Sequence, residues 1–308
     1  MRKYIFFFLL IPLFIYLLFS PGEAVRASAK GVDLWFHTVL PALLPFIILS
    51  GILVRSGILL PIFRKADKIF RIFPGLSGAG VYALLLGIFC GFPMGAKITA
   101  ELLREGSVSF REAKLLLQVS NHVSPAFLLG YVASLLPDPG WAFPAAVLYY
   151  SAAAASFFLT RGFPAVHFAT GKIRKKEASR SISPEELLDT SIMDGFLVIL
   201  KLGGYIILFT VWSEMVRSMS GGFPVLAPVC AIFLEISSGT EILLSAPLPP
   251  VLRMTLLLAG LSFGGISTAA QTAGMIRGSG LRLSLYLKGK LLQAGLAAAF
   301  TLLFFAVV

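Results

Sequence analysis

The stretch VLPALLPFIILSGILV, residues 39–54, decides the fold class of this chain, because it runs for 16 residues without a charged side chain. Residues 142–159 form a second uncharged block of similar length. A helix needs about 20 apolar residues to cross the hydrocarbon core of a bilayer. Blocks of this kind therefore predict a protein whose solvent is lipid.

The composition of the whole chain agrees with these blocks. Hydrophobic residues make up 57% and charged residues 13% of the sequence, and the mean hydropathy is +0.88. Soluble domains carry about 25% charged residues. We therefore predict an all-α polytopic membrane protein. The net charge of +11 would suggest nucleic acid as a partner of a soluble protein, but here most basic residues lie in loops between apolar segments. We expect the lipid bilayer and a small-molecule solute as partners, and no nucleic acid.

The sequence offers no residues for catalysis. It contains neither HExxH nor GxSxG, and neither a Walker loop nor a glycine-rich dinucleotide motif. The two cysteines, Cys90 and Cys230, lie inside apolar segments and form no metal-binding motif. We expect no enzyme activity, no metal site and no organic cofactor; the one ion we expect is a coupling Na⁺ or H⁺.

The first half of the chain contains two interruptions of its apolar segments. A helix over residues 4–19, retained or cleaved as a signal, and an outer loop make up residues 1–30. The first repeat, residues 31–160, then shows a long helix, a re-entrant hairpin with its tip at residues 91–95, a helix interrupted at residues 120–125, and a further helix.

The second half repeats the same order of elements. A basic cytoplasmic linker, residues 161–190, leads to the second repeat, residues 191–308. This repeat has a long helix, a hairpin around residues 236–240, a helix interrupted at residues 262–268, and a last helix. Each half then crosses the membrane three times, and an odd number of crossings inverts the second half relative to the first.

Basic residues support this inversion. With re-entrant hairpins and a cytoplasmic N-terminus, 19 of the 26 Lys and Arg residues fall on the inner side. We therefore expect a multi-pass membrane protein whose C-terminus lies outside. Inverted repeats with broken helices are typical of secondary transporters, which bind a solute where the breaks meet. Irregular backbone is tolerated at membrane depth only where protein or water satisfies its polar groups.

Three segments resemble a known family: residues 35–46, GFPMGAK at residues 91–97, and SNHVSP at residues 120–125. They resemble the YlbJ-type sporulation integral membrane proteins, which carry nucleoside-recognition (gate) domains. The resemblance covers nearly the whole chain. It implies an architecture similar to concentrative nucleoside transporters, a role in spore development, and a small spore solute such as dipicolinate as a candidate cargo.

Candidate binding residues cluster at the predicted tips and breaks. An ionisable side chain inside the membrane is a functional candidate, which singles out Lys97 and Glu235. Lys97 is either a counter-ion for an anion, or a partner of Glu235, or a side chain that reaches the cytoplasmic interface. Gly95 and Gly239 precede the second arms of the hairpins, where helix N-termini with unpaired N–H groups would favour an anionic solute.

Polar side chains at the tips and breaks complete the candidate site. We expect them to bind the solute or to satisfy backbone groups freed by the breaks. They are Asn121, His122, Ser124, Ser238, Ser267 and Thr268. The carbonyl groups of Gly264 and Gly265 would suit a cation such as Na⁺.

The sequence thus predicts a secondary transporter or permease of a small organic anion. Two alternatives stay open: a nucleoside transporter, and a structural or signalling membrane subunit that transports nothing. A homo-oligomer is compatible with each of them.

Overall fold

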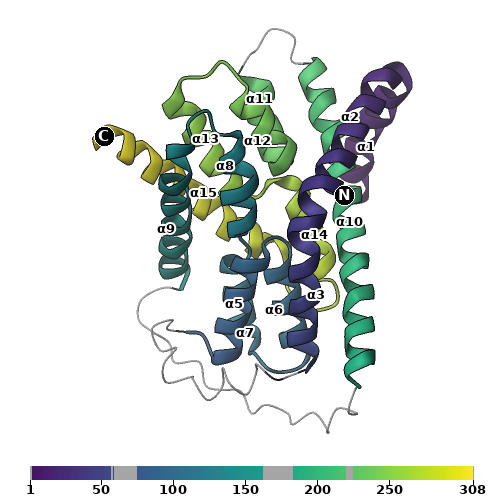
Figure 1. The fold of residues 1–308 in the computed structure, drawn as a ribbon, viewed down its shortest axis with the longest axis vertical. Helices are drawn as coiled ribbons and strands as arrows, with labels where there is room; N and C mark the ends of the chain where they lie inside the picture. Colours follow the sequence, from purple (N-terminus) through teal and green to yellow (C-terminus); the bar gives the residue numbers. More distant parts are fainter. Residues whose placement is uncertain (1, 57, 59–74, 162–182, 220–224, 308) are drawn as a thin grey trace.

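A computed structural model describes residues 2–56, 58, 75–161, 183–219 and 225–307, and the secondary structure within these residues is entirely helical (Figure 1). Five helical stretches among them are long and apolar enough to cross a membrane: Pro21–Leu53, Pro139–Arg161, Pro184–Met219, Pro250–Met275 and Leu283–Val307. Large apolar side chains such as Phe143 and Leu303 are exposed on the outside, as lipid-facing residues should be. The expectation of a polytopic α-helical membrane protein is confirmed at this level.

Two long helices lie side by side and run antiparallel. The first is continuous through α2 (Pro21–Leu34), the π-helical segment η1 (Trp35–Val39) and α3 (Leu40–Ser56); the second is α10 (Pro184–Met219). Gly31, early in the first helix, lies against Ile207, late in the second, and Ile48 lies against Gly195. Glycine at these positions lets the two helices approach closely, because a side chain there would collide with the partner helix.

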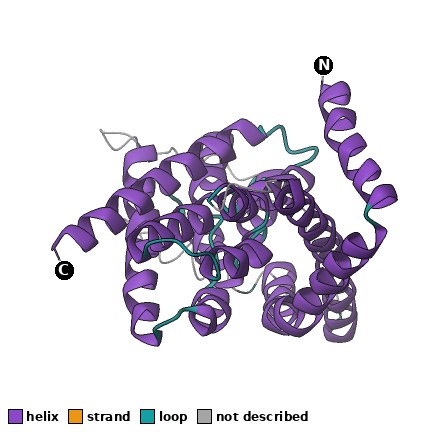
Figure 2. Ribbon diagram, turned by 90° about the horizontal axis from the view of Figure 1, so that it is seen from above, coloured by secondary structure: helices purple, strands orange, loops and turns teal. Residues whose placement is uncertain are grey.

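The start of the first long helix differs from our expectation. We expected an outer loop up to residue 30, and this was wrong, since Pro21 starts α2 directly after α1 (Arg2–Phe19). Proline suits the first helical position, and the small side chains of Ala24 and Ala27 are buried in a cluster shared with α1 and α10. Helix α1 lies at the edge of the bundle (Figure 2).

The basic linker lies mostly outside the described residues, which resume at residue 183. The second long helix starts within the span assigned to the linker, because Pro184 begins α10 and the Glu186 N–H donates to Ser183 Oγ over 3.2 Å.

The remaining helices repeat one order in the two halves. In the first half a hairpin, α5 (Gly78–Cys90) with α6 (Met94–Arg104), precedes a broken helix and then α9 (Ala142–Arg161). The broken helix consists of α7 (Phe110–Val119), η3 (Phe127–Val132) and α8 (Ala133–Leu135), and a short turn, η4 (Pro139–Trp141), leads into α9.

In the second half the hairpin is α11 (Leu226–Leu234) with α12 (Ile236–Leu244), the broken helix is α13 (Pro250–Phe263) with α14 (Gly265–Met275), and α15 (Leu283–Val307) ends the chain. In Figure 1 the first hairpin occupies the lower part of the bundle and the second hairpin the upper part. The two hairpins therefore lie toward opposite ends of the bundle.

Two interruptions are narrower than the sequence suggested. Residues 236–240, expected as a hairpin loop, form the first turns of α12, and the turn is the single extended residue Glu235. The second break, expected over residues 262–268, is confined to Gly264 and Gly265, whose φ values are 87° and 79°. The first break matches its prediction, because residues 120–124 are not helical.

Candidate functional site

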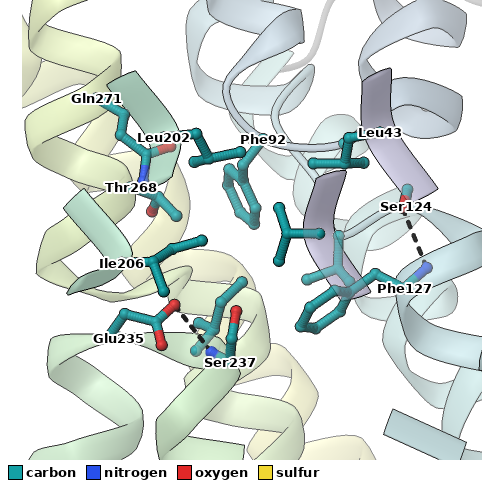
Figure 3. Close-up of a pocket in the computed structure, with 14 residues that line it drawn as sticks. Leu43, Phe92, Ser124, Phe127, Leu202, Ile206, Glu235, Ser237, Thr268 and Gln271 are labelled. Atoms are coloured by element: carbon teal, nitrogen blue, oxygen red, sulfur yellow. Dashed lines mark hydrogen bonds between the residues drawn. The ribbon is translucent and has the colours of Figure 1, made fainter. Parts of the chain in front are cut away.

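The two long helices, the two hairpin turns, the first break and helix α14 after the second break meet around one small cavity. Its volume is about 50 Å³. Figure 3 shows side chains from all six elements directed toward it. The lining residues are Val39, Leu43, Gly91, Phe92, Val123, Ser124, Phe127, Leu202, Ile206, Glu235, Ile236, Ser237, Thr268 and Gln271.

The two halves contribute matching positions to this cavity. Pro21 and Pro184 open the two long helices, and the same spacing in sequence separates the lining residues Val39 from Leu202 and Leu43 from Ile206. The two long helices therefore contribute lining residues from the same relative positions.

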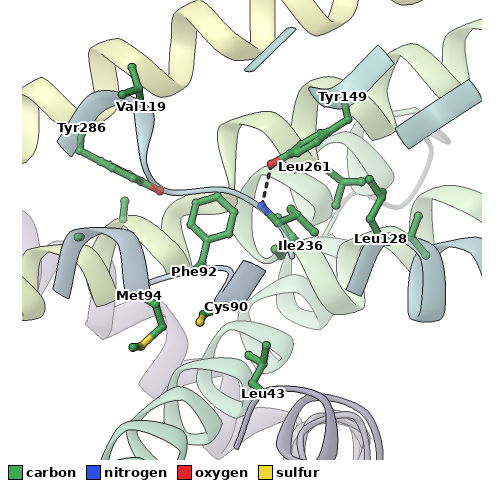
Figure 4. Packing of buried hydrophobic residues seen from close by; sticks show 14 of the residues in the cluster. Leu43, Cys90, Phe92, Met94, Val119, Leu128, Tyr149, Ile236, Leu261 and Tyr286 are labelled. Atoms are coloured by element: carbon green, nitrogen blue, oxygen red, sulfur yellow. Dashed lines mark hydrogen bonds between the residues drawn. The ribbon is translucent and has the colours of Figure 1, made fainter. Parts of the chain in front are cut away.

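Side chains from α9 and α15 hold the backbone of the first break. The Val123 N–H donates to Tyr149 Oη over 2.8 Å (Figure 4), and the Val123 carbonyl accepts from Tyr150 Oη over 3.0 Å. The Asn121 carbonyl accepts from Lys290 Nζ. The polar groups freed by the break are thus satisfied inside the protein, as membrane depth requires.

Asn121 connects this break to the first hairpin. Its side-chain Oδ1 accepts the Ala96 N–H in the first turn of α6 over 2.9 Å. Gly95 lies so close to the Ser120 carbonyl that any side chain there would collide with it. Gly95 is therefore a packing residue in this structure. The predicted ligand Asn121 uses its carbonyl oxygen as a helix cap, while its buried Nδ2 has no hydrogen-bond partner among the described residues.

Glu235 closes the second hairpin. Its carboxylate is 3% exposed and accepts from the Ser237 N–H over 2.9 Å, and from the Ser238 N–H and hydroxyl over 2.7 and 2.9 Å. The expectation that the N-terminus of α12 holds free N–H groups for an anion is therefore wrong, because Glu235 occupies them. Gly239 packs against the backbone of Ala231, which makes it the counterpart of Gly95.

The second break turns on Gly264, whose φ of 87° is a left-handed conformation that suits glycine. Thr268 Oγ1 donates to the Gly264 carbonyl over 2.7 Å and lies 3.0 Å from Tyr286 Oη. Ser267 Oγ accepts from Gln271 Nε2 over 3.2 Å. Gln271 Oε1 is buried and has no hydrogen-bond partner among the described residues, so the cavity retains a vacant acceptor in its wall.

The structure brings only some of the predicted site residues to the cavity. Ser124, Glu235 and Thr268 line it. His122 is buried, but its Nε2 lies 2.6 Å from the Val119 carbonyl and its ring meets the Tyr149 ring edge-on. It therefore contacts α7 and α9 and is not among the residues that line the cavity. Lys97 is partly exposed on α6 and is not part of the lining, so the structure gives no contact between it and Glu235.

Sequence reasoning missed Phe92, Phe127 and above all Lys290. Lys290 was one of the 19 basic residues counted on the inner side, whereas its side chain is fully buried in α15. A signal was present: Tyr286, Lys290 and Gln293 recur at helical spacing on an otherwise apolar helix. Such a polar stripe indicates a face turned toward the protein interior.

The fold and the cavity define a class: a multi-pass α-helical membrane protein with a buried, partly polar cavity between two similarly ordered halves. The chain is similar to the sporulation integral membrane protein YlbJ of Bacillus subtilis (strain 168), with 25% identity over 317 residues that cover 92% of this chain and 78% of the relative. No family model and no solved structure matches the chain.

Proposed function

We propose that this protein is a secondary transporter or permease that moves a small polar solute across a membrane during sporulation. The observation that carries the proposal is the convergence of both hairpin turns, the first break, helix α14 and both long helices on one cavity. Transporters with broken helices bind their solute at such a meeting point. The similarity to a sporulation integral membrane protein supports a membrane role in sporulation.

The size of the cavity indicates that binding requires movement. A cavity of about 50 Å³ is far smaller than typical ligand sites, which measure about 300–1,000 Å³. The halves must therefore separate on one side to admit a solute. Two exposed ion pairs suit this movement. Lys30 precedes the cavity residues along the first long helix and pairs with Glu241 over 3.0 Å, whereas Arg55 follows them and pairs with Asp194.

We take a small organic anion as the solute, with dipicolinate, which the family resemblance suggested, as the first candidate. A nucleoside is the second candidate. The capped N-terminus of α12 favours it, since Glu235 cancels part of the positive field that an anion would use. The aromatic rings of Phe92 and Phe127 in the cavity wall suit a planar solute of either kind.

Flux through proteoliposomes tests the proposal. The full chain is reconstituted, and uptake of labelled dipicolinate, other small carboxylates and nucleosides is measured under Na⁺ and H⁺ gradients, with protein-free liposomes as control. We expect saturable uptake of at least one carboxylate. Uptake of uridine or adenosine without any carboxylate would replace the anion by a nucleoside. If no solute moves while deletion of the gene still blocks sporulation, the protein is a structural or signalling subunit.

A further inference from the structure

Lys290 is a fully buried cation at the centre of the bundle. Its exposed fraction is 0%. Its Nζ donates to the Asn121 carbonyl in the first break and, over 2.7 Å, to Gln293 Oε1. Both acceptors are neutral. Among the described residues Lys290 has no acidic side chain within ion-pair distance.

An ammonium group in this position is costly without a negative partner. A buried charge is normally paired with an opposite charge, and charged side chains in membrane proteins mark solute or ion pathways. Holding one backbone carbonyl does not require a charge, because the neutral hydroxyl of Tyr150 donates to the Val123 carbonyl in the same break. The charge of Lys290 therefore needs another explanation.

Phe92 separates this cation from the cavity. The Lys290 Nζ lies 5.2 Å from the centre of the Phe92 ring, and Phe92 also lines the cavity. Figure 4 shows the Phe92 ring beneath the first break, between Tyr149 and Tyr286. The tip of the ring, Cζ, lies against Gly264, where a side chain would collide with it. A turn of the Phe92 side chain would join the ammonium group to the cavity.

The side chain of Asn121, whose carbonyl binds Lys290, carries a polar group without a partner in the described part of the chain. The buried Asn121 Nδ2 has none among the described residues, and the carbonyl of the same residue accepts from Lys290. The ammonium group of Lys290 and the amide N–H₂ of Asn121 are both donors from which a carboxylate can accept hydrogen bonds.

We propose that Lys290, with Asn121 beside it, is the counter-ion that receives the carboxylate of an anionic solute once Phe92 turns aside. The proposal rests on the proposed transport function and names the chemical class of its solute. It also gives the site the positive charge that the capped N-terminus of α12 does not supply.

Equilibrium binding to the purified full chain, measured separately from flux, tests this assignment. The probes are dipicolinate and a panel of other small carboxylates, each compared with its uncharged amide. The variants are Lys290→Met, which keeps the length but removes the charge, and Lys290→Arg, which keeps the charge. Lys288→Met, an exposed position on the same helix, is the matched control.

We expect Lys290→Met to weaken carboxylate binding more than about tenfold, with amide binding unchanged within about twofold, and Lys290→Arg and Lys288→Met to retain carboxylate binding. If Lys290→Met weakens carboxylate and amide equally, Lys290 only supports the break and the assignment is wrong. The assignment also fails if the unaltered protein binds no carboxylate of the panel. Carboxylate binding that depends on Lys290 without any flux would instead leave the assignment standing and refute transport.

Discussion

The two hairpins begin their second helices in different ways. In the first hairpin the Ala96 N–H is satisfied by Asn121, which belongs to the neighbouring broken helix. In the second hairpin Glu235 satisfies the N–H groups of Ser237 and Ser238 from the turn itself. The same order of elements is thus held by contacts between elements in one half and by a local cap in the other.

The breaks differ in the same sense. The first break depends on Tyr149, Tyr150 and Lys290, and Lys290 comes from the second half of the chain. The second break is a pair of glycines, Gly264 and Gly265, whose carbonyls accept from the Thr268 hydroxyl of the following helix. We conclude that changes in the first hairpin and break should affect the elements that they contact, whereas loss of the Glu235 cap should stay within the second hairpin.

The largest loss of stability is expected at the local cap. Glu235→Ala leaves two buried N–H groups without acceptors, which should lower the free energy of unfolding by about 3 kcal/mol. Glu241→Ala is the control, because the ion pair of Glu241 with Lys30 is exposed and worth at most about 1 kcal/mol. Chemical unfolding of both variants in detergent measures the difference. Equal losses would show that Glu235 is not the cap of α12.

A smaller but more widespread effect is expected at Asn121. Asn121→Ala leaves the Ala96 N–H unsatisfied and should cost about 2 kcal/mol. Hydrogen exchange should rise in α6 as well as in the first break, because Asn121 joins them. Gln118→Ala removes a side chain that bonds only to the Lys114 carbonyl of its own helix, and serves as the control. Increased exchange confined to the first break would contradict the coupling between the break and the hairpin.

The smallest expected effect concerns the second break. Gly264→Ala places a methyl group on a left-handed residue and within 2.7 Å of Phe92 and Thr268, and should cost about 1–2 kcal/mol. Gly274→Ala, in the same helix α14 with open space around it, should be neutral or stabilising. Thermal unfolding of the pair checks this. A Gly264→Ala variant as stable as Gly274→Ala would mean that Gly264 is not needed for the turn.

The coarse fold could be predicted from the sequence because apolar blocks and proline or glycine interruptions act locally. The break at residues 120–124 was found in this way. The second hairpin turn was placed too late, because Ser237, Ser238 and Gly239 look like loop residues unless Glu235 is recognised as their cap.

The candidate site was harder to predict, because its members come together only through packing of distant elements. Ser124, Glu235 and Thr268 reach the cavity, but nothing local indicates that His122 faces away from it or that Lys290 meets Asn121 across 169 positions of sequence. Residue type identified the polar candidates, whereas their direction depends on the fold.

Movement between the two halves is the central claim, and a reversible cross-link tests it most directly. Gly51 and Ser191 lie on opposite long helices, and a β-carbon at Gly51 would lie 3.5 Å from that of Ser191, within the range for a disulfide of about 3.5–4.5 Å. Cysteines are placed at both positions in a background that lacks Cys90 and Cys230, and the single-cysteine variants are controls.

Solute flux in proteoliposomes is then measured before oxidation, after oxidation and after reduction. We predict that oxidation stops flux in the double variant alone and that reduction restores it, because the disulfide holds the two halves together at one end of the cavity. Undiminished flux through the fully cross-linked protein would contradict a transport cycle in which the halves move around the shared cavity.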